Sequence, residues 1–284
     1  MPRFPTADPH AATAVHLFDA LMQQHGWGLD RAWLAVAKLL LTCQVWRDGI
    51  WRPLPTLPPG TPLLMESNNY RLGIGGMPNA DIRNAVLVRN YIAGQLGVQP
   101  EGLCGELGLY FREPSVVALQ PNNIRGHAYR SLVARTLERF GDPELEIREE
   151  ASVRALFPGF PLNTRSVDPN LDIAVSRNGL PVALVSVRWT YRHDRVDMLD
   201  EAHAYVPPAR RTNTNCGFYG VTAEFGAARL DKVVSQSEPV NQYGIVRRLV
   251  HLHSALATTV IGHDHRLVHM MDLADFVQSS FGWY

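Results

Sequence analysis

The stretch from residue 172 to residue 188 combines an acid, a hydroxyl and a base at spacings that folding can bring together. Asp172 begins an apolar run typical of a buried strand, and a second predicted strand carries Ser186 and Arg188, two residues apart and therefore on one face. The Asn-Gly pair at 178–179 favours a tight hairpin between the two strands. We therefore expect Asp172 close to Arg188. An acid and a cation at neighbouring strand ends can together hold a divalent ion, a phosphate and a water.

A charged tetrad, Arg-His-Asp-Arg at 192–195, follows the second strand. Each arginine can bond bidentately with O6 and N7 of guanine, and the aspartate can accept a hydrogen bond from N4 of cytosine. Two such chains related by a two-fold axis would read a G·C-rich palindrome. A solvated loop of ion-paired charges is the alternative interpretation. Glu201 lies thirteen residues after Arg188, on a predicted helix that could return its carboxylate to the site.

The segment VSVRWTYRHDRVDMLDEA resembles the active-site stretch of type II restriction endonucleases of the NgoMIV kind, in the CCGG-cutting branch of the PD-(D/E)xK nucleases. The family pattern has an Asp at a strand start, S-x-K-W-T on the next strand, then an R-x-D-R reader and a Glu. VTAEFGAARL at 221–230 also resembles the family, which tends to have a V-T-x-E strand. The matching positions are Asp172, Ser186, Trp189, Thr190, Arg192, Asp194, Arg195 and Glu201.

Two positions depart from this pattern. Arg188 stands where the family has its catalytic lysine. Arginine keeps the positive charge and can grip the scissile phosphate, but it does not deprotonate in the useful pH range. The usual Pro-Asp pair reads Leu-Asp here, and Asp168, which precedes a proline, competes with Asp172 as the metal ligand. We favour Asp172, because an apolar strand follows it directly. The family often has a further acid on an earlier helix, for which Glu138 is the best placed residue.

The resemblance implies a site-specific double-strand DNA endonuclease that depends on Mg²⁺, with Mn²⁺ able to replace it. Asp172 and Glu201 would bind the metal, Arg188 would neutralise charge on the phosphate, and Ser186 would support the site. The readers of a palindrome with a CCGG-like core would be Arg192, Asp194 and Arg195. The family also implies a homodimer or a tetramer and a cognate DNA methyltransferase that protects the host.

The arginine at position 188 keeps a second function open. A sequence-specific DNA-binding protein on the same scaffold, catalytically weak or inactive, would bind the same core without cutting it. Arg210 and Arg211, followed by Thr-Asn-Thr-Asn, form a predicted loop whose basic and small polar groups suit contacts with DNA phosphates. A solvated loop explains them equally well.

Hydrophobic periodicity and turn residues predict the elements that must position these groups. Predicted helices cover 11–24, 29–45, 79–96, 124–140, 198–205 and 244–260, and predicted strands cover 171–176, 180–189 and 218–225. This order favours an α/β (α+β) fold with a short mixed sheet flanked by helices, and the resemblance implies a restriction-endonuclease-like core. We expect a mainly helical N-terminal region at 1–120, packed on a nuclease core with the DNA-reading segment at 121–284.

The composition is that of a globular protein. Apolar residues make up 46% of 284 residues, and 27 basic residues balance 27 acidic ones, which excludes a disordered chain and a basic tail that coats nucleic acid. Lys38 and Lys232 are the two lysines, so the basic residues are mainly arginine, the planar fork suited to phosphates and base edges. Three separated cysteines, no apolar signal core and no membrane span favour a reduced, bacterial cytoplasmic protein.

Overall fold

The structure is a computed structural model that describes residues 9–47, 50–53, 71–74, 82–100, 121–161, 169–189, 191, 197–262 and 267–284. The strands of its central sheet are β4 (Glu146–Ser152), β5 (Asn170–Arg177), β6 (Leu180–Arg188), β7 (Gly217–Thr222), β8 (Arg248–His251) and β9 (Met271–Asp272). They lie in the order β4-β5-β6-β7-β8-β9. The first three strands are antiparallel, whereas β6 to β9 are parallel, so β6 is the strand at which the sheet changes direction.

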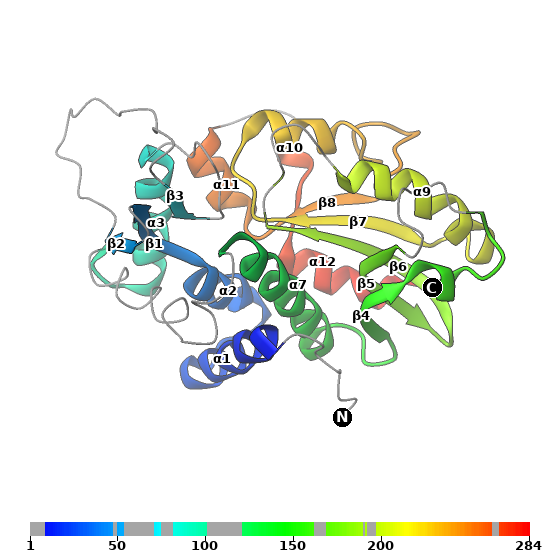
Figure 1. The fold of residues 1–284 in the computed structure, drawn as a ribbon, viewed down its shortest axis with the longest axis horizontal. Helices are drawn as coiled ribbons and strands as arrows, with labels where there is room; N and C mark the ends of the chain where they lie inside the picture. Colours follow the sequence, from blue (N-terminus) through cyan, green and yellow to red (C-terminus); the bar gives the residue numbers. More distant parts are fainter. Residues whose placement is uncertain are drawn as a thin grey trace.

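Helices cover both faces of this sheet (Figure 1). They are α1 (Pro9–His25), α2 (Ala32–Leu40), α3 (Ile82–Leu96), α7 (Pro121–Phe140), α8 (Val153–Leu156), α9 (Asp197–Thr212), α10 (Ala227–Val234), α11 (Ser254–Ile261) and α12 (Leu273–Ser279). Short 3-10 segments lie at Leu29–Arg31, Leu267–His269 and Ser280–Gly282. The predicted α/β class with a mixed sheet is therefore confirmed. Among the described helices, none combines the length and the apolar character needed to cross a bilayer.

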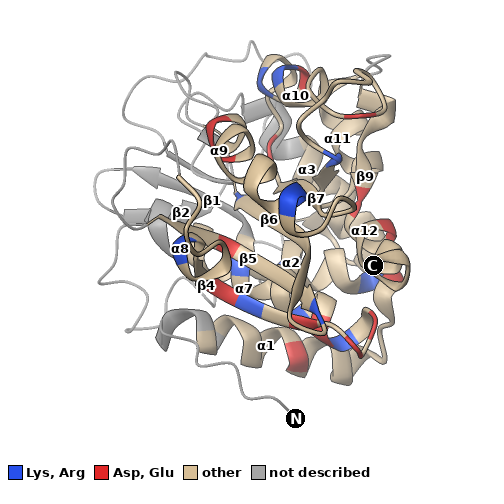
Figure 2. Ribbon diagram, turned by 90° about the vertical axis from the view of Figure 1, so that its right-hand side faces the viewer, with Lys and Arg blue, Asp and Glu red and all other residues tan. Residues whose placement is uncertain are grey.

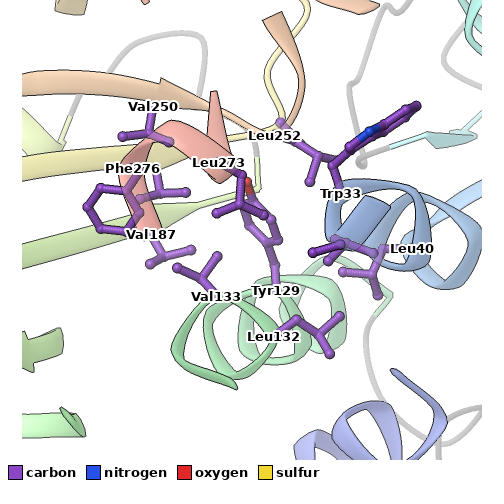
Figure 3. Packing of buried hydrophobic residues seen from close by; sticks show 14 of the residues in the cluster. Trp33, Leu40, Tyr129, Leu132, Val133, Val187, Val250, Leu252, Leu273 and Phe276 are labelled. Carbon is purple, nitrogen blue, oxygen red and sulfur yellow. The ribbon is translucent and has the colours of Figure 1, made fainter. Parts of the chain in front are cut away.

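Two hydrophobic cores lie on opposite faces of the sheet. Val185 and Val187 of β6 belong to the core beneath α7 and α12, whereas Leu184 belongs to the core beneath α9 and α10. This alternation follows from the pleat of a strand, which directs successive side chains to opposite faces. Figure 3 shows Tyr129 and Val133 of α7 on the first face, beside Val187. Ser186 therefore faces α9, the helix that carries Glu201.

The N-terminal helices share the first of these cores. Phe18 of α1, Leu34 of α2 and Ile92 of α3 are fully or almost fully buried in the same cluster as Tyr129 of α7. A small antiparallel sheet accompanies them, in the order β2-β1-β3, with β1 at Leu41–Arg47, β2 at Ile50–Pro53 and β3 at Arg71–Ile74. The first part of the chain thus adds helices and a second sheet to the body of the protein.

The predicted hairpin between β5 and β6 is confirmed, and its backbone explains the preference for Asn-Gly. Asn178 has φ of 51° and Gly179 has φ of 77°. Two consecutive left-handed residues are required by the type I′ turn, whose twist matches that of the flanking strands. Arg177 pairs with Leu180, and Ile173 pairs with Val185, across the hairpin.

Three predicted helix boundaries are wrong. The helix predicted at 29–45 ends at Leu40, and β1 begins directly after it, where the β-favouring residues Thr, Val and Trp occur. The helix predicted at 244–260 is divided into β8 and α11, because a short apolar run next to β7 completes the parallel sheet and periodicity alone does not distinguish the two cases. The helix predicted at 198–205 continues through Pro207 and Pro208 to Thr212, whose hydroxyl donates to the carbonyl of Pro208 at 3.3 Å.

The strand β4 was not predicted at all. Its sequence, EIREEAS, is mostly charged, and it lies at the edge of the sheet, where one side is open to solvent. The ribbon of β4 carries the colours of both basic and acidic residues in Figure 2. Charges on an edge strand hinder pairing with another chain, and they also remove the apolar alternation that would reveal a strand in the sequence.

Gly220 controls how closely α9 approaches the sheet. It lies on β7 directly opposite Ser186, and a Cβ built on it would overlap the thioether of Met198, lying 2.7 Å from the methyl carbon. Met198 is one helical turn before Glu201, so we expect Gly220→Ala to push this turn of α9 outwards. Overpacking of this kind lowers the free energy of unfolding by about 1–3 kcal/mol. Urea unfolding measures the loss, and adding Met198→Ala should reverse part of it; equal stability of Gly220→Ala and wild type would contradict the packing.

Buried tyrosines make the stability of the fold depend on alkaline pH. Burial raises the pKa of Tyr129 and of Tyr191, because the apolar surroundings disfavour the phenolate. The unfolded chain releases these protons near pH 10, whereas the folded chain retains them, so stability should fall as the pH rises above about 10. Urea unfolding between pH 8 and pH 11 measures this slope. Tyr129→Phe should flatten it, whereas Tyr243→Phe, at an exposed tyrosine, should leave it unchanged.

Candidate functional site

Asp172, Arg188 and Glu201 form one connected ion-paired group. The guanidinium of Arg188 places Nη1 on Oδ2 of Asp172, at 2.5 Å, and Nη2 on Oε1 of Glu201. Asp172 belongs to β5, Arg188 to the end of β6 and Glu201 to α9, so three elements meet here. The hairpin brings the first two together, as expected, and α9 returns the third.

Ser186 lies between the two carboxylates and is fully buried. Its hydroxyl donates to Oε2 of Glu201 at 2.5 Å and lies 3.4 Å from Oδ2 of Asp172. The backbone N–H of Val187 donates to the same Oδ2 of Asp172 at 2.8 Å. The strand β6 therefore holds both carboxylates with one hydroxyl, one backbone N–H and one guanidinium.

The site is partly screened from water. The side chains of Arg188, Asp172 and Glu201 are 29%, 19% and 20% exposed, enough for a ligand to reach them. Burial alone would lower the pKa of Arg188, but the carboxylates of Asp172 and Glu201 outweigh burial and raise it above the ordinary value of arginine. Burial, with a smaller contribution from Glu201, raises the pKa of Tyr205 to about 12. The permanent positive charge of Arg188 therefore lies against the carboxylates of Asp172 and Glu201.

The other sequence-predicted residues are not seen in this ion-paired group. Arg192, Asp194, Arg195, Thr190 and Asp168 lie outside the described residues. Arg210 and Arg211 were expected in a loop, but they form the last turn of α9, which continues to Thr212. Arg210 pairs with Glu238 at 3.0 Å, so part of its charge is already offset within the protein. Arg211 lies over the ring of Phe160, 5.9 Å from its centroid.

Glu138 does not join the ion-paired group as the further acid. It pairs with Arg135 at 2.6 Å, and Arg135 also bonds with Asp19 of α1. The helix α7, which carries Glu138, packs in the core on the other face of the sheet from α9. Glu138 and Arg135 both belong to α7, and it is Arg135 that joins this face of α7 to Asp19 of α1.

Glu224 is a charged residue to which the sequence analysis assigned no role. It is fully buried just after β7 and accepts hydrogen bonds from the backbone N–H of Tyr191 at 2.9 Å and of Gly226 at 2.6 Å. Arg229 donates to both of its oxygens, from Nε at 2.9 Å and from Nη2 at 2.8 Å. Glu224 therefore fixes the point at which the chain leaves β6, directly before residue 192. A single acid at the end of the apolar run GFYGVTAEF was the available signal.

The pair formed by Glu224 and Arg229 should contribute strongly to stability. Arg229→Ala leaves a buried carboxylate without this counter-charge, and we expect a loss of about 3–5 kcal/mol in the free energy of unfolding. Arg210→Ala, which breaks a pair between half-exposed groups, should cost about 1 kcal/mol or less. Urea unfolding of both variants tests this contrast. Similar losses in the two variants would show that Glu224 does not depend on Arg229.

The chemistry of the two carboxylates fits Mg²⁺. This ion prefers oxygen ligands and commonly binds through one or two carboxylates, with waters and substrate phosphates completing its coordination. Within the described ranges, no group of three or more His, Cys, Asp or Glu residues could hold a metal ion. Asp172 and Glu201 alone would supply two carboxylates, and waters or a phosphate would have to supply the other ligands. Arg188 engages both carboxylates, and a metal would have to share them with it.

Comparison with family models, with curated proteins and with solved structures found no match to this chain. The inference of function consequently rests on the residues and the geometry described above.

Proposed function

We propose that the chain is a type II restriction endonuclease, a Mg²⁺-dependent enzyme that hydrolyses phosphodiester bonds of double-stranded DNA at a palindromic site with a CCGG-like core. The observation that carries this proposal is the meeting of Asp172, Arg188 and Glu201, with Ser186 between the carboxylates. Two carboxylates and a cation at one end of a sheet provide for a metal ion and for a phosphate group.

The order of elements around the site supports the proposal. The elements follow one another as α7, β4, the short helix α8, β5, β6, α9 and β7, in which β4, β5 and β6 are antiparallel and β7 is parallel to β6. They form a mixed sheet flanked by helices, which is the architecture that the sequence resemblance implies for a nuclease core. The acidic and basic residues lie at the β5 start, the β6 end and the first turns of α9, where that resemblance expects them.

Each residue of the site has a role that follows from its contacts. Asp172 and Glu201 would hold the metal, which when bound lowers the pKa of a water and stabilises the leaving oxygen. Arg188 would neutralise the developing charge on the phosphate, and its permanent charge excludes it as a general base. Ser186 would keep Glu201 oriented through its hydrogen bond.

Recognition and biological setting extend the proposal. Arg192, Asp194 and Arg195 would read the core of the site through guanine and cytosine edges in the major groove. A palindromic target would be bound by a homodimer or a tetramer. A cognate methyltransferase would modify the same site in the host, and both enzymes would act in the bacterial cytoplasm. The cofactor would be Mg²⁺, with Mn²⁺ as a substitute.

The contacts of Arg188 favour one alternative, a sequence-specific DNA-binding protein that does not cut. Its guanidinium bridges the two carboxylates that a nuclease would use for the metal. A chain in which that bridge persists would bind DNA through the same surface without hydrolysis. The two functions differ in the products formed with Mg²⁺, whereas both predict binding to duplexes that contain CCGG.

Digestion of a sequenced plasmid with purified protein and Mg²⁺ tests the proposal. We expect discrete fragments whose ends share a CCGG core, and we expect Asp172→Ala to lower the cutting rate by at least about 100-fold, because it removes a metal ligand. Asp200→Ala, at an exposed acid next to Glu201 on α9, is the matched control and should cut like wild type.

The other outcomes separate the two functions. Binding to CCGG-containing duplexes in Ca²⁺ without cutting in Mg²⁺ or Mn²⁺ would favour the non-cutting protein. If Arg188→Lys cut the plasmid and wild type did not, the lack of activity in wild type would be due to the arginine at position 188. Absence of both binding and cutting at low salt would overturn both functions.

A further inference from the structure

We infer that Arg188 is a built-in counter-ion that occupies the position of the divalent cation between Asp172 and Glu201, so that metal binding requires its guanidinium to leave at least one carboxylate. The inference deepens the proposed function, on which it rests for the identity of the metal. It concerns how the site is regulated: the protein's own cation competes with the cofactor.

The guanidinium of Arg188 bridges the two carboxylates. Nη1 of Arg188 contacts Asp172 and Nη2 contacts Glu201, so one planar fork spans both carboxylates from its two terminal nitrogens. The same oxygen of Asp172, Oδ2, also accepts from the N–H of Val187 at 2.8 Å. A divalent ion that bound both carboxylates would compete with the guanidinium for the oxygens that it now contacts.

The charges explain why this competition is strong. Two ionised carboxylates that contact the same group repel each other, and the permanently charged guanidinium offsets that repulsion. Arginine cannot leave the site by losing its proton, in contrast to a buried lysine. A metal ion must therefore replace the ion pairs of Arg188 rather than enter a site with free carboxylates.

The type of residue at position 188 should set the affinity for the metal. Lysine has one compact ammonium group, which bridges two carboxylates less well than a fork with two nitrogens. Glutamine has no charge and would leave two carboxylates that attract a cation. The expected order of metal affinity is Arg188→Gln above Arg188→Lys above wild type.

Titration of the metal-free protein with Mn²⁺, with free Mn²⁺ detected by electron paramagnetic resonance, tests this order without DNA. We expect Arg188→Gln to bind at least about tenfold more tightly than wild type, since a full positive charge has been removed beside the ion. Adding Asp172→Asn to Arg188→Gln should abolish the gain. Arg148→Gln, which removes an exposed arginine of the edge strand β4 paired with Glu146, should bind like wild type.

An equal affinity of wild type and Arg188→Gln would overturn the inference. Should Arg188→Gln fail to fold because its carboxylates repel each other, Arg188→Lys retains the charge, and an affinity no higher than that of wild type would overturn the inference equally. If Arg188→Gln bound Mn²⁺ tightly but neither wild type nor any variant cleaved DNA, the counter-ion role of Arg188 would be supported and the proposed nuclease function would be contradicted. If wild type cleaved DNA and the variants bound Mn²⁺ as wild type does, only the counter-ion role of Arg188 would be contradicted.

Discussion

Two carboxylates from different elements lie close together in this protein because one guanidinium lies between them. Asp172 comes from β5 and Glu201 from α9, and Arg188 contacts both from the end of β6. Like charges that contact the same group repel each other, so the cation between them lowers the electrostatic cost of packing α9 on the sheet. The ion-paired group is therefore both the candidate catalytic site and a tie between the hairpin and α9.

Packing and hydrogen bonds in the surrounding fold position this ion-paired group between the sheet and α9. Alternation along β6 buries Val185 and Val187 against the helices of one face, which directs Ser186 to α9 on the other. The absence of a side chain at Gly220 allows α9 to approach, and the buried carboxylate of Glu224 fixes the backbone of Tyr191 beyond the strand. Packing and hydrogen bonding thus set where the charges lie, while the charges set what can bind.

Local signals in the sequence predicted the candidate site better than the fold around it. The Asn-Gly turn predicted the hairpin that brings Asp172 near Arg188, although a register shift between Val175 and Ser176 offsets the pairing on the way to the site. The return of Glu201 followed from its spacing on a helix. The strand β8 could not be predicted, because it depends on parallel pairing with β7, a contact between distant segments. The edge strand β4 lacks the apolar alternation by which strands are identified. The role of Glu224 depends on burial, which spacing does not reveal.

The direction change of the sheet at β6 has a consequence for the order in which the chain folds. The hairpin of β5 and β6 is local, and it can bring Asp172 to Arg188 before distant segments meet. Glu201 can join them only when α9 completes the crossover and β7 pairs in parallel with β6, which closes a longer loop. The hairpin by itself holds one acid and one base in a neutral pair, and the second acid arrives with the crossover. The net negative charge of the group therefore depends on the long-range pairing of β6 with β7 and not on the local hairpin.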